Sequence, residues 1–313
     1  MKNRYPLPVY IIFKLLGFIP SCAAWSISSV LGTLLYRILK KHRRIVKTNM
    51  RLSFPDKRPH QIEKLARRVF INNIMVLFEG GWSLHLSPSD FDTHFTIDGR
   101  THLTNTFKRK KGVLLLTAHI GNWELLPISA KMLGIKANII YRPLDSNVLN
   151  KFFKYSRTRF GSVAVPNKKA MRPIMKALKQ NECVSLLMDQ NVDVYEGVFT
   201  DFFGRPACTS KGLAMLALRT GAAVVPAFLI RNGKNEFLVK MGPEIPLIQT
   251  GSSQKDIYVN TVQYTAAIED IVRQYPEQWL WLHQRWKTKP IPPAIKGSAS
   301  LFSICFTFSI STM

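Results

Sequence analysis

The feature that most constrains the fold is an alternation, from residue 113 to residue 241, of short apolar runs with stretches of helical spacing. Strands that alternate with helices form βαβ units, which place helices on both faces of a parallel sheet. The sequence therefore predicts an α/β fold with a mixed, mostly parallel sheet flanked by helices. The predicted strands are Val113–Thr117, Ala137–Tyr141, Ser162–Val165, Val184–Met188, Ala222–Ile230 and Glu236–Met241, and the predicted helices between them are Asn122–Leu133, Asn147–Phe160, Arg172–Lys179 and Ser210–Thr220.

Two more helices are predicted outside this alternation. Apolar residues recur at helical spacing over residues 60–84, ending near Gly80, and again over residues 254–275, with Pro276 as a stop. The chain has 313 residues, 46% of them hydrophobic, which is enough to fill a large core. We expect residues 46–290 to form one catalytic domain. Residues 291–313 begin with a Pro-rich break and lack any period, which favours a disordered tail over a segment that dips into a membrane.

The N-terminal region contains an apolar segment, Leu15–Tyr36, without a charged residue. At about 1.5 Å per residue, a helix of this length would reach across the hydrocarbon core of a bilayer. Pro20 and several serines interrupt it, so an interfacial or re-entrant hairpin stays open as the alternative. The basic cluster at residues 40–44 predicts a cytoplasmic location for the rest of the chain. Residues 1–45 are therefore predicted to be a membrane anchor with a basic flank.

The chain is strongly basic, with 44 Lys and Arg against 19 Asp and Glu and a formal net charge of +25. Such a surplus favours anionic partners, namely nucleic acid, an acidic carrier protein or an anionic lipid surface. No nucleic-acid-binding motif is present, and an uncharged N-terminal segment does not suit a DNA-binding protein, so we expect no nucleic acid partner. The four cysteines are far apart and match no metal-ligand spacing, which predicts reduced thiols in a reducing compartment.

The segment most informative about chemistry is Gly112–Leu126, with the sequence GVLLLTAHIGNWELL. His119 follows the end of a predicted strand, where open α/β sheets build their active sites. Glu124 could meet the imidazole only if the chain turns between them, and Gly121 permits that turn. A carboxylate on one imidazole nitrogen raises the basicity of the other, so the pair predicts a general base. The alternative is a helix-capping histidine with an exposed glutamate. A zinc site is disfavoured because the HExxH spacing is absent.

The motifs along the chain resemble those of the bacterial lipid A biosynthesis acyltransferases, the late lauroyl and myristoyl transferases of the HxxxxD/E glycerolipid acyltransferase superfamily. The resemblance covers roughly residues 5–290. The segments that carry it are TAHIGNWELLP, YRPLD at Tyr141–Asp145, RFGS at Arg159–Ser162, MDQN at Met188–Asn191, GVFTDFFG at Gly197–Gly204 and PEQWLWLHQRWKTKP at Pro276–Pro290.

This resemblance implies transfer of a fatty acyl chain from acyl carrier protein, or acyl-CoA, to a hydroxyl of a lipid A precursor at the inner face of the cytoplasmic membrane. It implies that His119 is the base and Glu124 its partner, and that no metal or redox cofactor is needed. Arg159 would stabilise an oxyanion or hold a phosphate. Independently of the resemblance, Asp189 and Gln190 follow the predicted strand Val184–Met188, at the same kind of sheet edge as His119, which predicts that they line the same cleft; the alternative is an Asp that caps the next turn. Two alternatives remain: another glycolipid or glycerophosphate acceptor, and a basic membrane-surface scaffold without catalysis.

Two aromatic segments carry weaker predictions. Val198, Phe199, Phe202 and Phe203 could wall an acyl channel or belong to the core. Three tryptophans near the end of the predicted domain alternate with basic residues, a mixture typical of the membrane interface. These residues are Trp279, Trp281, Arg285, Trp286, Lys287 and Lys289.

Overall fold

The computed structural model describes residues 6–290, so the predicted tail at residues 291–313 lies outside the described residues. A seven-stranded sheet forms the centre of this part of the chain, in the order β1-β9-β8-β2-β5-β3-β4. Within residues 6–290, the β8–β9 pairing is the one antiparallel neighbour in this sheet. The strands are β1 (Phe95–Asp98), β2 (Val113–Thr117), β3 (Ala137–Tyr141), β4 (Val163–Pro166), β5 (Cys183–Leu187), β8 (Ala223–Gly233) and β9 (Glu236–Met241).

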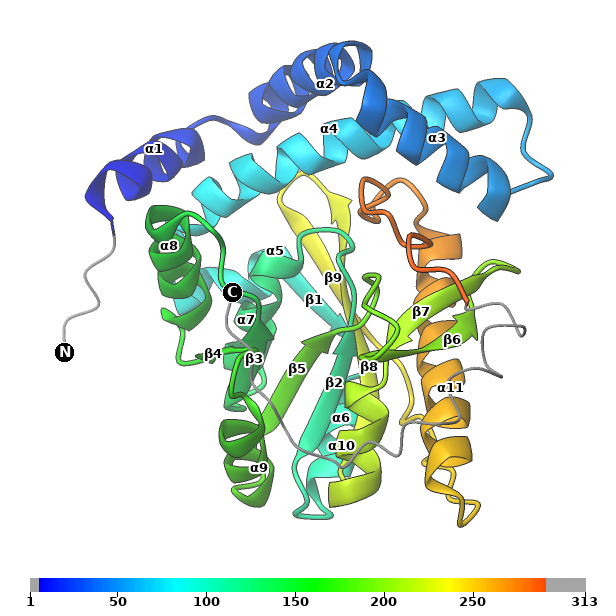
Figure 1. The fold of residues 1–313 in the computed structure, drawn as a ribbon. Coiled ribbons are helices and arrows are strands. Elements are labelled where there is room, and N and C mark those ends of the chain that lie inside the picture. The colour runs from blue at the N-terminus through cyan, green and yellow to red at the C-terminus, as the bar shows by residue number, and fades with distance from the viewer. Residues whose placement is uncertain (1–5, 291–313) are drawn as a thin grey trace.

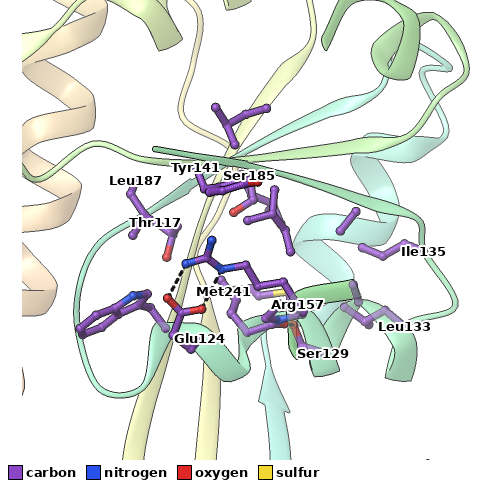
Figure 2. A pocket seen from close by; sticks show the side chains of 18 residues that line it. Thr117, Glu124, Ser129, Leu133, Ile135, Tyr141, Arg157, Ser185, Leu187 and Met241 are labelled. Atoms are coloured by element: carbon purple, nitrogen blue, oxygen red, sulfur yellow. Dashed lines mark hydrogen bonds and ion pairs between the residues drawn. The ribbon is translucent and has the colours of Figure 1, made fainter. Parts of the chain in front are cut away.

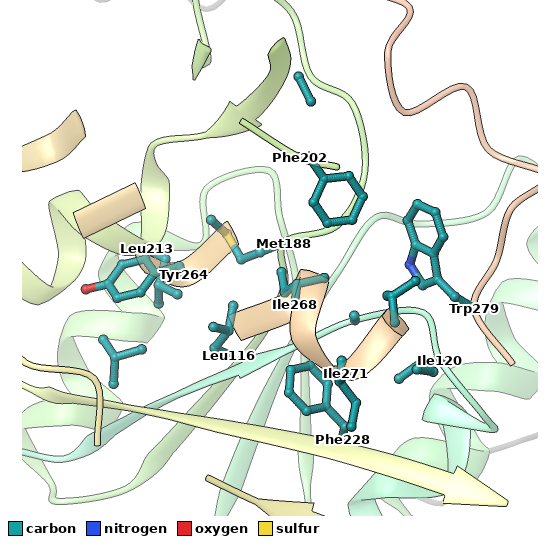
Figure 3. Packing of buried hydrophobic residues seen from close by; sticks show 14 of the residues in the cluster. Leu116, Ile120, Met188, Phe202, Leu213, Phe228, Tyr264, Ile268, Ile271 and Trp279 are labelled. Atoms are coloured by element: carbon teal, nitrogen blue, oxygen red, sulfur yellow. The ribbon is translucent and has the colours of Figure 1, made fainter. Parts of the chain in front are cut away.

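Helices cover both faces of the sheet, as the predicted βαβ units require. Strand β2 is buried along its whole length because alternate side chains enter different cores. Leu114 and Leu116 pack into the larger core (Figure 3), while Val113 and Leu115 pack into the second. The helices α9 (Met171–Lys179), α10 (Gly212–Thr220) and α11 (Ser253–Gln274) contribute to the larger core, and α6 (Arg100–Phe107) and α7 (Leu126–Met132) contribute to the second.

The N-terminal helices form a layer across one end of the sheet (Figure 1). They are α1 (Leu7–Gly17), α2 (Ser21–Ile38), α3 (Lys40–Ser53) and α4 (Pro59–Ser83). The uncharged segment is thus divided near Pro20, and α1 and α2 are bent by 109°. Over residues 6–290 no single helix has the length and apolar composition to cross a bilayer, although α1 and α2 meet that criterion as a bent pair.

Several elements were absent from the sequence-based prediction. A two-stranded antiparallel hairpin, β6 (Gly197–Asp201) and β7 (Pro206–Ser210), lies outside the main sheet. Helices α3, α6 and the short α5 (Phe91–His94), the edge strand β1 and a 3-10 turn at Pro88–Asp90 were also not predicted. Helix α8 (Asn147–Thr158), by contrast, corresponds to the predicted helix at Asn147–Phe160. The predicted helix at 122–133 begins later than expected, because Trp123–Leu125 forms a 3-10 turn before α7.

Cys22, Cys183 and Cys208 are free thiols, as the sequence predicted, and Cys305 lies outside the described residues.

Candidate active site

His119 lies two residues beyond the end of β2, as the sequence predicted. The chain turns sharply at Gly121, which has a φ of +59°, a value that favours glycine. A side chain at this position would also collide with the carbonyl oxygen of Leu229 on β8. The strand end and this turn therefore fix the position of His119.

The imidazole of His119 is oriented by Asp189, which follows β5. The Nδ1–H of His119 donates a hydrogen bond to Oδ1 of Asp189 over 2.8 Å. The other carboxylate oxygen, Oδ2, accepts from the backbone N–H of His119 over 2.9 Å and from the indole N–H of Trp279 over 2.8 Å. Because Nδ1 carries the proton, Nε2 is left as the basic nitrogen, and it lies near the Gln190 amide.

The predicted hydrogen bond between His119 and Glu124 is wrong for this structure. Both oxygens of Glu124 accept from Arg157 on α8, over 2.8 Å from Nε and 2.7 Å from Nη2. The guanidinium also lies over the rings of Tyr141 and Phe153. A guanidinium offers a carboxylate two parallel donors, which an imidazole cannot match. Glu124 therefore pairs with Arg157, and Asp189 takes the place at the imidazole.

The surroundings of His119 shift its titration. Burial by itself would lower the pKa of the imidazole, but the charge and hydrogen bond of Asp189 more than offset this, so the pKa of His119 is raised. Glu124 makes a smaller contribution in the same direction, and Arg157 opposes it. Burial would raise the pKa of Asp189, yet His119 and the indole of Trp279 hold it below its usual value. Asp189 is thus an anion that strengthens the base.

Two cavities meet beside His119. A wide, open cleft is lined by His119, Gln190 and the chain after β3, including Arg142 and Leu144. An adjoining cavity lies between the sheet and α7, and its walls are mostly aliphatic. Figure 2 shows Glu124 and Arg157 near one end of this cavity and Leu133 and Ile135 near the other. Trp123, Glu124, Tyr141 and Arg157 line both spaces and so mark the boundary between them.

The structure places the other predicted site residues unequally. Gln190 and His119 line the open cleft, whereas Asp189, also predicted there, is not among its lining residues and is buried against the imidazole. Arg159 lines neither of these two cavities and stacks on Phe160, with ring and guanidinium 4.5 Å apart. Burial lowers the pKa of Arg159 to about 10. Its neighbour Arg157, which the sequence argument missed, lies at the cavities. The sequence feature that could have pointed to Arg157 is its spacing of four residues from Phe153, which places both side chains on one face of α8.

Burial decides the two aromatic predictions. Phe202 and Phe203 are 0% and 4% exposed and pack in the larger core, which was one of the two alternatives for this segment, and they line neither of the two cavities. The three tryptophans Trp279, Trp281 and Trp286 are also buried and cannot face a membrane interface.

The segment that carries these tryptophans instead supports the active site from behind. The carbonyl of Gln278 accepts from the N–H of Gly121, and the N–H of Leu280 donates to the carbonyl of His119. Trp279 supplies the indole that bonds Asp189. The turn at His119 and the carboxylate of Asp189 are therefore held by the same three-residue stretch, residues 278–280.

Comparison with known proteins shows the family of the chain. A family model described as bacterial lipid A biosynthesis acyltransferase matches residues 6–288. A lipid A biosynthesis lauroyltransferase of Escherichia coli is 28% identical over 265 residues, covering 83% of this chain and 84% of that protein. A lipid A biosynthesis palmitoleoyltransferase of the same organism is 26% identical and covers 87% and 86%.

A more distant relative is a phosphatidylinositol mannoside acyltransferase of Mycolicibacterium smegmatis, which is 24% identical and covers 59% of this chain and 60% of that protein. The match to the family model spans most of the chain and includes every residue at the junction of the two cavities. The chain therefore belongs to the bacterial lipid A biosynthesis acyltransferases, and it is an acyltransferase.

Proposed function

We propose that the protein transfers a fatty acyl chain from a thioester donor, acyl carrier protein or acyl-CoA, to a hydroxyl group of a lipid A precursor, with His119 as the general base. The observation that carries this proposal is the environment of the His119 imidazole. Its Nδ1 is fixed by Asp189, while its Nε2 lies in a cleft that adjoins an apolar cavity. A base beside an apolar cavity suits the acylation of an alcohol by a fatty acyl donor.

In the proposed reaction, Nε2 of His119 accepts the proton of the acceptor hydroxyl as its oxygen attacks the thioester carbonyl carbon. The tetrahedral intermediate then collapses, the carbon–sulfur bond breaks, and the thiolate leaves with the proton held by His119. Asp189 stabilises the imidazolium that exists between these two transfers. The step balances without a metal or a redox partner, so none is part of the proposal.

The apolar cavity is the proposed site of the acyl chain. Aliphatic side chains such as Leu126, Leu133 and Ile139 line it, as a site for a hydrocarbon chain requires. The thioester would then lie at the boundary formed by Trp123, Glu124 and Arg157. We propose that Glu124 acts there by holding Arg157, whose positive charge faces the region where the carbonyl oxygen becomes negative.

We also propose that the enzyme works at the inner face of the cytoplasmic membrane, with its catalytic domain on the cytoplasmic side. Two features support this location: the apolar N-terminal helices and the basic residues that follow them. Both substrates suit the charge of +25, because acyl carrier proteins are acidic and lipid A precursors carry phosphates.

The test is mass spectrometry of the products formed from a lipid A precursor and acyl carrier protein charged with chains of defined length. We expect one added acyl group with the wild type. His119→Ala should lower turnover about 10²–10⁴-fold, the usual contribution of a general base, while circular dichroism shows an intact fold. Near-normal turnover in that variant would refute the role of His119. Parallel reactions with acyl-CoA identify the donor.

A second candidate keeps the chemistry and changes the acceptor to another glycolipid. The relative named phosphatidylinositol mannoside acyltransferase favours it, since it covers 59% of this chain. The same assay distinguishes the two, because only one of the acceptors would gain mass.

A further inference from the structure

Thr117, the last residue of β2, carries a buried hydroxyl group without a hydrogen-bond partner. The residue is 3% exposed, and among residues 6–290 its Oγ1 bonds to no protein atom. The large majority of buried side-chain polar atoms in proteins have a partner. The unpaired hydroxyl of Thr117 therefore points to a ligand that supplies one.

The other buried threonines show how unusual this hydroxyl is. Within residues 6–290, Thr117 is the only threonine whose fully buried hydroxyl lacks a partner. The hydroxyl of Thr106 on α6, a residue that is also 3% exposed, donates to the carbonyl of Leu103 over 2.6 Å. A helix offers a threonine such a carbonyl in its preceding turn, whereas an extended strand does not.

The strands around Thr117 leave its hydroxyl facing the apolar cavity. Thr117 lies opposite Leu187 of β5 in the ladder, and Leu115 precedes it on the same face of β2. All three residues line the apolar cavity, and neither leucine can donate or accept a hydrogen bond. An occupant of the cavity is therefore the available partner for the hydroxyl.

The position of Thr117 decides which part of an acyl donor it meets. Figure 2 shows Thr117 on the side of the cavity where Glu124 and Arg157 lie, away from Leu133. At this end the cavity adjoins the cleft of His119. Thr117 and His119 are two residues apart, so their Cα atoms are separated by at most about 7 Å. The carbonyl group of a donor, rather than its hydrocarbon chain, would therefore lie beside the hydroxyl.

The hydroxyl of Thr117 is also held in a fixed place. The carbonyl of Thr117 accepts from the N–H of Met188 over 3.1 Å, so its backbone belongs to the ladder between β2 and β5. A β-branched side chain has few rotamers available. A donor that is in position before charge develops stabilises an oxyanion without the cost of reorganisation. The Thr117 hydroxyl meets this condition.

We propose that the hydroxyl of Thr117 donates a hydrogen bond to the carbonyl oxygen of the acyl donor, and that this bond strengthens as the attack of the acceptor makes that oxygen negative. The hydroxyl keeps its proton throughout, because His119 takes the proton of the acceptor and Thr117 forms no covalent bond. Arg157 would act on the same oxygen through its charge. This inference rests on the function proposed above.

The substitution Thr117→Val tests the proposal, because it removes the hydroxyl and nearly preserves the shape of the side chain. It should lower kcat about 10²–10³-fold and leave KM within about threefold, since the lost interaction is made mainly in the transition state. The urea midpoint of unfolding should not fall, because the removed hydroxyl has no partner in the protein. Thr117→Ser keeps a hydroxyl and should retain kcat within about fivefold of the wild type.

Thr106→Val is the matched control, since it makes the same change at an equally buried threonine. It removes the hydrogen bond to Leu103, so it should lower the urea midpoint and leave kcat within about twofold of the wild type. The proposal would be overturned by a kcat of Thr117→Val within about twofold of the wild type, or by an effect confined to KM. It would also be overturned by a loss of kcat that accompanies a lower urea midpoint and that Thr117→Ser does not avoid.

Binding of unreactive analogues separates this inference from the proposed function. Isothermal titration calorimetry compares two analogues of dodecanoyl-pantetheine: an amide, in which NH replaces the sulfur, and a thioether, in which a methylene group replaces the carbonyl. The wild type should bind the amide about three- to tenfold more tightly than the thioether, and Thr117→Val should bind both equally. The same preference in both proteins would overturn the hydrogen bond. Absence of transfer by the wild type with any donor would instead refute the proposed function, and the dissociation constants would still decide the role of Thr117.

Discussion

Of the two carboxylates near His119, Asp189 contributes most to the raised pKa of the imidazole. Asp189→Asn preserves the shape of the side chain but removes the negative charge that favours the imidazolium. The pKa of His119 should therefore fall, and the acidic limb of the kcat/KM profile should move to lower pH. The maximal rate should fall about 10²–10⁴-fold, because the amide no longer stabilises the charged intermediate state of the base. A pH profile of both variant and wild type measures the shift.

Glu124→Gln is the matched control for that experiment. Glu124 contributes less than Asp189 to the raised pKa of His119, and its own hydrogen bonds go to Arg157. The acidic limb should therefore move less in Glu124→Gln than in Asp189→Asn. The reverse order would mean that Glu124 becomes the partner of the imidazole once substrate is bound, as the HxxxxE spacing first suggested.

The sequence offers two carboxylates as hydrogen-bond partners of His119, Glu124 and Asp189, but it does not decide between them. Both His119 and Asp189 follow strands, and the sequence placed them at the same edge of the sheet. Their contact depends on β2 and β5 being neighbours in register, with Thr117 opposite Leu187. Two residues further, the same register brings His119 to Asp189. The order of strands depends on contacts between residues far apart in the sequence. Local spacing therefore favours the nearby Glu124 over Asp189.

At the scale of whole elements, a buried ion pair ties α4 to the active-site turn. Glu79 of α4 accepts hydrogen bonds from Arg231 of β8 and from Asn122, which lies between His119 and Glu124. Arg231 also donates to Asn72 over 2.6 Å and lies 5.7 Å from the ring centre of Trp25 on α2. The pair therefore joins the N-terminal helical layer, the sheet and the turn that follows His119.

Glu79→Gln should lower the free energy of unfolding by about 3–5 kcal/mol, because it leaves the buried Arg231 without its counter-charge. The control on the same helix is Glu63→Gln. Glu63 pairs with Lys47 at the surface, where the side chain is 47% exposed, and should cost about 0–1 kcal/mol. Urea denaturation followed by circular dichroism measures both. Similar losses in the two variants would show that the buried pair has no special role.

Most elements of the fold were readable from local patterns. Buried strands such as β3 and β9 have the predicted bounds because apolar runs define them directly. The missed elements have weaker signals. Strand β1 has four residues and pairs with β9, more than 130 positions away, and the β6–β7 hairpin mixes polar and apolar residues without a regular alternation. The break between α1 and α2 at Pro20 was visible, but the angle between them depends on packing against α4.

The whole molecule combines two attractions with different ranges. The exposed apolar side chains of α1 and α2 interact only on contact, whereas a net charge of +25 acts over the Debye length, which is about 10 Å at 0.1 M salt. The apolar side chains suit the proposed membrane surface. The charge attracts an acidic partner before the two molecules are in contact. If the donor is an acidic carrier protein, its encounter with the enzyme should be accelerated electrostatically, by about 10–10³-fold at low salt.

The salt dependence of kcat/KM should therefore distinguish an acyl carrier protein donor from an uncharged thioester donor. Raising NaCl from about 0.05 M to about 0.5 M should lower kcat/KM for acyl carrier protein about tenfold or more, because the longer-range attraction is screened. An uncharged acyl thioester of the same chain length should change little, since its arrival does not depend on charge. Initial rates in detergent micelles keep membrane binding out of the comparison. Equal salt dependence for the two donors would show that the basic surplus serves the lipid surface or the acceptor, and that the carrier protein docks without it.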